Sequence, residues 1–156
     1  MSEPSISHVF IRGDYVPYAE ANVSIMTHAM HYGTGAFAGM RAYWNAEQEQ
    51  LYSFRPLLHF ERLLQSASLL RMHFDYSPED LLEILKKLII MQGFRTNCYI
   101  RPLVYIAEES LAVRVHDLKS DLAIIVRPEG NYISIPGGAH VCFSPIRYLS
   151  SPRSPP

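Results

Sequence analysis

The feature that most constrains the fold is a pair of consecutive segments, residues 56–72 and 77–94, in which apolar residues recur at helical spacing. The apolar residues of the first are Leu57, Phe60, Leu63, Leu64, Ala67 and Leu70, and those of the second are Leu81, Leu82, Leu85, Leu88 and Ile89. Pro56 suits the first turn of a helix, Ser77 is expected to cap the second helix, and Gly93 is expected to end it. The pattern predicts two helices, each with one buried face.

Segments with strand character lie on both sides of this helical pair. Before it come "HVFIRGDYVPY", expected to form a hairpin around Gly13 and Asp14, and the two runs "GAFAGMRAYW" and "QLYSFR". After it come "CYIRPLVYI", "DLAIIV" and "AHVCFS". Strands, two helices and then strands predict an α+β fold, with both helices packed on a largely antiparallel sheet. The expected domain covers residues 1–128, followed by a Gly- and Pro-rich linker at 129–138 and a short segment at 139–156.

Charge and composition exclude several classes of function. The formal net charge of −1 leaves no basic surface that would attract nucleic acid or an anionic membrane, and no apolar run is long enough to cross a bilayer. Cys98 and Cys142 lie in strand-like runs, so both are expected to be buried and reduced, without a disulfide, in a cytoplasmic protein. A metal site made from His28, His31 and His59 is not expected, because the local pattern holds no accompanying carboxylate or cysteine.

The stretch "HAMHYGTGAFAGMRAY" packs small residues between aromatic ones. Glycines such as Gly39 permit close approaches, and Tyr32 and Phe37 offer rigid walls, so the stretch predicts either an apolar ligand pocket or a glycine-containing turn that leads into a core strand. In "YIRPLVY", alternation places Tyr99 and Arg101 on one face of a strand. An arginine there would meet either a ligand carboxylate or a protein carboxylate.

Residues 56–72 carry one further cation. Arg62, in "HFERLLQSA", lies beside the apolar face of the first helix, where it would be either solvated or within reach of a phosphate or carboxylate in a neighbouring cleft.

Three motifs, in this order, resemble a known family: "THAMHYGTGAFAGMRAY", "HFERLLQSASLLRM" and "CYIRPLVY". They are similar to the N-terminal half of fold-type IV pyridoxal-phosphate aminotransferases, and above all to branched-chain amino acid aminotransferases. The resemblance implies the small domain of that fold, with 139–156 as the beginning of a truncated large domain. It also implies pyridoxal 5'-phosphate as cofactor, leucine, isoleucine, valine and 2-oxoglutarate as substrates, and a homodimer or higher oligomer.

The same resemblance implies roles for individual residues. Arg62 would bind the cofactor phosphate. The substrate would contact Tyr32, Phe37, Gly39, Tyr99, Arg101 and Val113. Within that set, Arg101 would hold the distal carboxylate of a dicarboxylic substrate, and Tyr32 and Val113 would act across the subunit interface. The sequence departs from the family at Ala38, where a glutamate is usual, and this bears on fine specificity.

The Schiff-base lysine of the family has no counterpart among Lys86, Lys87 and Lys119. By resemblance it lies beyond the end of the chain, so no catalytic residue is expected within it, and the chain alone is expected to be incompetent for transamination. Two alternatives stay open. One is a noncatalytic truncated domain that binds or dimerises, and the other is a relative of the D-amino-acid aminotransferases or aminodeoxychorismate lyases.

Overall fold

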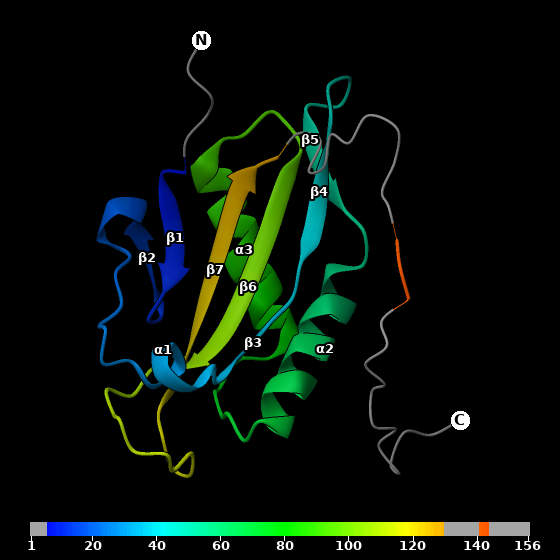
Figure 1. Cartoon of the computed structure of the whole chain (residues 1–156). Helices are drawn as coiled ribbons and strands as arrows, with labels where there is room; N and C mark the ends of the chain where they lie inside the picture. The colour runs from blue at the N-terminus through cyan, green and yellow to red at the C-terminus, as the bar shows by residue number, and fades with distance from the viewer. Residues whose placement is uncertain (1–5, 130–140, 144–156) are drawn as a thin grey trace.

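The computed structural model describes residues 6–129 and 141–143, and its centre is a seven-stranded antiparallel sheet (Figure 1). The strands are β1 (His8–Ile11), β2 (Asp14–Pro17), β3 (Gly35–Phe37), β4 (Met40–Asn45), β5 (Gln50–Ser53), β6 (Cys98–Ile106) and β7 (Ser120–Pro128). Their order is β2-β1-β7-β6-β4-β5, and β3 pairs with β6 beyond the end of β4. The helices are α1 (His28–Tyr32), α2 (Pro56–Leu69) and α3 (Pro78–Gln92), with a short 3-10 turn at Tyr18–Glu20. The predicted α+β fold is confirmed.

The two long helices begin and end where the sequence predicts. Pro56 opens α2, and Ser77 caps α3 in a reciprocal capping box with Asp80. Gly93 ends α3 with a φ of 63°, a left-handed conformation that favours glycine. On the buried faces, the fully covered residues are Phe60, Leu63, Ala67, Leu81, Leu85 and Leu88. Leu70 was expected among them but is 47% exposed, because α2 ends before it.

Both long helices cover the same face of the sheet, and in Figure 1 they lie behind it. The core between them contains alternate residues of the strands, including Phe10, Met40, Ile100, Val104 and Ile124. The neighbouring residues in each strand therefore point to the opposite face, which neither α2 nor α3 covers. This uncovered face carries Tyr99 and Arg101, two of the residues selected from the sequence.

The strand expected over "GAFAGMRAYW" is interrupted at Ala38 and Gly39, which separate β3 from β4. The expectation of one continuous strand was wrong at these two residues, although β3 and β4 pair with β6 in a single register, from Gly35 opposite Tyr105 to Ala42 opposite Cys98. The Ala38 amide donates to the carbonyl of Pro102 (3.1 Å), and the Ala38 side chain is buried.

The hairpin at Gly13 is confirmed: Arg12 and Gly13 have φ values of 55° and 78°, as a tight turn between twisted strands requires.

The expectations for "AHVCFS" were wrong in the part that the structure describes. Residues 141–143 form no strand, and Cys142 is exposed rather than buried, because no described strand pairs with this segment. Cys98 is buried, as predicted, and both cysteines are free. The linker expected at 129–138 lies outside the described residues from position 130 onwards. Within the described residues, the helices are too short and too polar to cross a bilayer.

Candidate functional site

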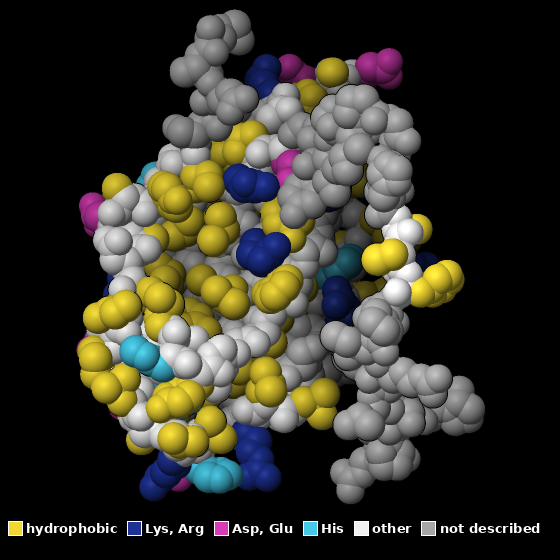
Figure 2. Space-filling view, in the orientation of Figure 1, with side chains coloured by type: hydrophobic (Ala, Val, Ile, Leu, Met, Phe, Trp, Pro, Cys, Tyr) yellow, Lys and Arg dark blue, Asp and Glu magenta, His cyan; other side chains and the backbone are white. Residues whose placement is uncertain are grey.

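The uncovered face of the sheet is mainly apolar, with a few basic side chains near its centre (Figure 2). Alternation along β6 exposes Tyr99, Arg101 and Leu103 on this face, while Ile100 and Val104 enter the core, as the sequence predicted. The cross-strand partners of Tyr99 are on the same face: Arg41 on β4 and Arg127 on β7. The face therefore combines apolar area with arginines close to one phenol ring.

Tyr99 and Arg101 form the best-defined polar contact on this face. The Arg101 guanidinium donates from Nη2 and Nε to the Tyr99 hydroxyl, at 2.7 and 3.2 Å. The same guanidinium carbon lies 4.3 Å from the centroid of the Phe37 ring, a cation–π arrangement. Among the ion pairs of residues 6–129, none involves Arg101. Of the two partners expected for this arginine, a protein carboxylate is therefore not found among the described residues.

Gly39 is needed for this arrangement because it lies directly against Tyr99. A Cβ atom at position 39 would overlap the Tyr99 hydroxyl and would stand 3.2 Å from the ring carbon that bears it. The structure thus brings together Phe37, Gly39, Tyr99 and Arg101, four of the residues selected from the sequence.

A hollow of about 370 Å³ opens between β4, α2 and Tyr99. Its lining consists of Gly39, Met40, Arg41, Tyr43, Phe54, His59 and Tyr99. Arg62 is one turn along α2 from His59, and its Nη2 donates to His59 Nδ1 at 3.3 Å. Arg62 is exposed and takes part in no ion pair among the described residues. Its guanidinium therefore lies at the border of the hollow with unused donors, which suits a phosphate.

Tyr32 and Val113 belong to a second assembly, where α1 meets the loop before β7. The Tyr32 hydroxyl donates to the Leu111 carbonyl at 2.7 Å, and Val113, two residues further along, is 79% exposed. His28 is completely buried, with its Nε2 3.0 Å from the Ala112 carbonyl and its Nδ1 2.9 Å from the Thr34 hydroxyl. These contacts use the ring of His28 to hold the loop, and the described residues contain no cluster of metal ligands.

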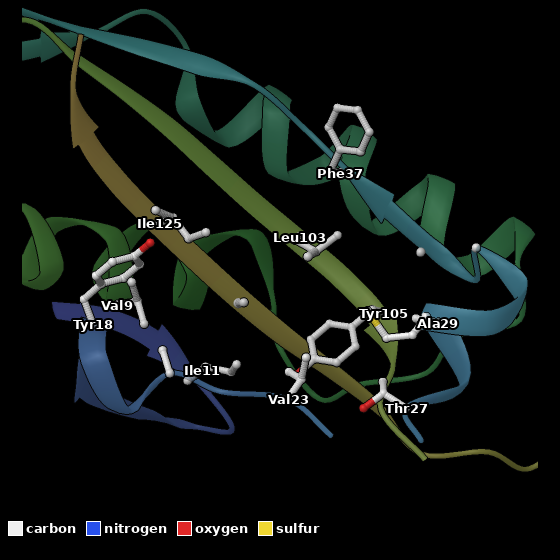
Figure 3. A pocket seen from close by; sticks show the side chains of 15 residues that line it. Val9, Ile11, Tyr18, Val23, Thr27, Ala29, Phe37, Leu103, Tyr105 and Ile125 are labelled. Atoms are coloured by element: carbon white, nitrogen blue, oxygen red, sulfur yellow. The ribbon is translucent and has the colours of Figure 1, made fainter. Parts of the chain in front are cut away.

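A larger apolar hollow, about 490 Å³, lies on the same face of the sheet (Figure 3). Val9, Ile11 and Ile125 form part of its floor. Phe37 also lines it, and the Phe37 ring contacts the guanidinium of Arg101. Tyr105 lines it too and donates to Asp121 Oδ2 at 3.0 Å. Burial, together with the charge of Asp121, raises the pKa of Tyr105 well above its ordinary value, so this phenol stays protonated.

Two proteins similar in sequence to this chain are described as branched-chain-amino-acid aminotransferases. The chain is 41% identical over 134 residues to a protein of Aquifex aeolicus described as a probable branched-chain-amino-acid aminotransferase, a match that covers 86% of this chain and 43% of the relative. It is 30% identical to the branched-chain-amino-acid aminotransferase of Salmonella typhimurium, covering 85% of this chain and 42% of the relative. A scan against models of protein families finds no match.

Solved structures agree with these relatives. The branched-chain aminotransferase of Thermoproteus uzoniensis, solved with norvaline, superposes with a TM-score of 0.77 at 36% identity, covering 83% of this chain and 43% of that one. The branched-chain amino acid aminotransferase of Escherichia coli gives a TM-score of 0.76 at 30% identity, covering 83% of this chain and 42% of that one.

The chain has the fold of the N-terminal small domain of branched-chain aminotransferases. The family resemblance inferred from the three motifs is thereby confirmed. The chain spans less than half the length of the branched-chain aminotransferases that it matches.

Branched-chain aminotransferase structures similar to this chain contain pyridoxamine 5'-phosphate in one case and the cofactor itself, in a holo form, in another. The residues around the smaller hollow fit such a group: His59 and Tyr99 line it, and Arg62, which donates to His59, stands at its border and forms no ion pair among the described residues. Within the described part of the chain, the smaller hollow has no lysine in its lining that could form a Schiff base with the cofactor. Lys86 and Lys87 lie on α3, behind the sheet, and Lys119 precedes β7. None of the three residues lines the smaller hollow.

Sequence reasoning considered His28 and His59 only as metal ligands, and it did not select Arg41 or Arg127. His59 could have been found from its position three residues before Arg62, because residues at that spacing share a helix face. The two arginines required the strand register, which pairs both of them with Tyr99.

Proposed function

We propose that this chain forms the substrate-side wall and part of the phosphate site of a pyridoxal-phosphate-dependent branched-chain aminotransferase. The amino donors would be leucine, isoleucine and valine, and the acceptor 2-oxoglutarate. The observation that supports this most strongly is the contact of Arg101 with both the Phe37 ring and the Tyr99 hydroxyl, beside the space left by Gly39. One surface can then accept either an apolar side chain or a second carboxylate.

The residues of this chain would bind and orient, and the cofactor, when bound, supplies the electron-withdrawing ring through which the amino group is transferred. Arg62 would hold the phosphate through charge-assisted hydrogen bonds, with His59 fixing the position of its guanidinium. Phe37 would pack against an aliphatic side chain and exclude water from it. Arg101 would neutralise the distal carboxylate of 2-oxoglutarate, and the Tyr99 hydroxyl keeps Arg101 in place.

We further propose that Tyr32 and Val113 act in a dimer, at the active site of the partner subunit. Val113 is highly exposed on a loop held by His28 and Tyr32, as a residue that inserts into a neighbour would be. A variant Val113→Asp would then weaken self-association without changing the fold of the chain, as sedimentation and circular dichroism would show.

The experiment that tests the cofactor role uses pyridoxamine 5'-phosphate, which carries the phosphate but no aldehyde that could react with a lysine. Arg62→Ala is expected to weaken its binding to the chain about tenfold, because a charge-assisted contact contributes roughly 1.5–3 kcal/mol. Binding of pyridoxamine, which has no phosphate, should stay unchanged. Arg95→Ala serves as the control, since Arg95 pairs with Glu49 in an exposed ion pair elsewhere. Equal losses for both probes would contradict the role of Arg62.

A second candidate function is a noncatalytic binding or dimerisation domain, and the positions of the three lysines favour it for the chain in isolation. It predicts that pyridoxal phosphate followed by borohydride leaves no lysine preferentially modified, as mass spectrometry of peptides would show. Stoichiometric modification of one lysine would exclude this alternative.

The other alternative is a relative that acts on D-amino acids or aminodeoxychorismate. Assaying an assembled enzyme with L-leucine, D-alanine and aminodeoxychorismate would distinguish it.

A further inference from the structure

Arg127 places a second guanidinium beside the ring of Tyr99. It lies on β7 directly opposite Tyr99 in the strand register, and its guanidinium carbon is 5.9 Å from the centroid of the Tyr99 ring. The guanidinium carbon of Arg101 is 5.2 Å from the same centroid. The Arg127 side chain is 49% exposed, so it faces the solvent on the same side as Arg101. Two cations thus stand near one phenol.

Glu129 holds Arg127 in this position. Its side chain is only 7% exposed, and its Oε1 accepts from Arg127 Nη2 at 3.1 Å. The second carboxylate oxygen, Oε2, is buried and has no hydrogen-bond partner within residues 6–129 and 141–143. A buried carboxylate with one satisfied oxygen is costly, and it depends strongly on the one cation that it contacts. Glu129 therefore both positions Arg127 and neutralises its charge.

The Tyr99 hydroxyl completes the donor set. Its oxygen accepts two N–H groups from Arg101, which leaves the hydroxyl proton free to donate outward. A carboxylate that approaches this face would meet an O–H donor, the unused N–H groups of Arg101 and the exposed part of Arg127. Convergent donors of this kind favour a carboxylate over a neutral group.

We propose that Arg127, positioned by Glu129, acts with Arg101 and Tyr99 to bind the second carboxylate of a dicarboxylic substrate. Glu129 competes for Arg127 and so limits the affinity for that carboxylate. A site that must also release the dicarboxylate and accept an aliphatic side chain benefits from such competition. The inference rests on the proposed function for the identity of the dicarboxylate.

The test measures binding of glutarate, a dicarboxylate that has no keto group to react, to the full 156-residue chain by NMR titration. The matched probe is 4-methylvalerate, which has one carboxylate and a branched apolar end. Arg127→Gln is expected to weaken glutarate binding about fivefold to tenfold and to change 4-methylvalerate binding less than about twofold. Arg127→Lys should recover part of the loss, because it restores the charge without the planar fork.

Glu129→Gln gives the complementary result. With the competing carboxylate removed, glutarate should bind about threefold to tenfold more tightly, whereas a purely structural role for Glu129 would leave affinity unchanged or lower it. Arg127→Gln leaves a buried carboxylate unpaired, so Arg127→Gln/Glu129→Gln is the variant that keeps the fold if the single change does not. The double variant should bind glutarate more weakly than Glu129→Gln alone.

The outcomes separate the two proposals. If Arg101→Gln weakens glutarate binding and neither Arg127→Gln nor the double variant does, the role of Arg127 is overturned while the proposed function stands. If Arg101→Gln has no effect on glutarate binding, the proposed function loses its acceptor site. Tighter glutarate binding by Glu129→Gln together with loss on Arg127→Gln supports the inference.

Discussion

Gly39→Ala is the change whose effect follows most directly from the structure. Gly39 lies at the join between β3 and β4, and a Cβ there would overlap the Tyr99 hydroxyl. The backbone at Gly39 is not in the left-handed region, so alanine suits its conformation, and the clash with Tyr99 is the main obstacle. The phenol must move, and its two hydrogen bonds with Arg101 are then lost or lengthened.

The change in the free energy of unfolding caused by Gly39→Ala is the difference between two effects. Hydrogen bonds to a charged group contribute about 1.5–3 kcal/mol, and the half-buried setting of Tyr99 and Arg101 favours the low end of that range. Alanine in place of glycine stabilises by about 0.5 kcal/mol through the unfolded state, where its backbone has less freedom. The free energy of unfolding should fall by about 1 kcal/mol, which lowers Tm by roughly 2–4 °C in a chain of this size.

The assay is a double-mutant cycle with Tyr99→Phe, read by urea unfolding and by glutarate binding. In the Tyr99→Phe background the overlapping oxygen is gone, so Gly39→Ala should cost at least about 1 kcal/mol less than it does in the parent. Glutarate binding should fall about tenfold in Gly39→Ala alone, because both Tyr99 and Arg101 leave their places. Equal destabilisation in both backgrounds would refute the steric argument, since Gly39 would then act through something other than the hydroxyl.

Three further outcomes are expected. His28→Ala leaves buried polar partners unsatisfied and should lower the free energy of unfolding by about 2–3 kcal/mol, and hydrogen exchange should accelerate in residues 108–113 before it does in the sheet. Hydrogen bonds from Ser77 lower the pKa of Asp80 below its ordinary 3.8, so their stabilisation is fully present above that pH and is lost as pH falls through the depressed value. Urea unfolding should therefore show that the stability gap between the parent and Ser77→Ala narrows in acid. At about pH 8 iodoacetamide should label Cys142 and spare Cys98, whose thiol is buried and whose pKa burial raises to about 11; equal labelling rates would contradict this.

Most of the site could be selected from local pattern. The alternation of "YIRPLVY" placed Tyr99 and Arg101 on one face, and the structure has them there. Arg62 was selected as a cation beside the apolar stripe of a helix, and it does lie at the border of a hollow. Its role in cofactor binding, and the substrate roles of Tyr32 and Val113, stay predictions.

Arg127 and Glu129 could not be selected in this way, because nothing in "DLAIIVRPEG" marks them. Their importance depends on which residue of β6 lies opposite Arg127, and a shift of one position would turn Arg127 toward the core face. The same limit explains the error at Cys142, which had strand character in its own segment but no strand beside it among the described residues.

The sequence by itself determined the elements of this protein: the two capped helices, the hairpin at Gly13 and the alternation along β6 each follow from neighbours within a few residues. Local sterics, capping and periodicity act over that range, so they can be read without a structure. Only the tertiary structure decided which face of the sheet the helices leave open, and which side chains from β3, β4, β6 and β7 meet on it. That outcome depends on strand register and on the burial of one face against α2 and α3, which are set by contacts between residues far apart in the chain.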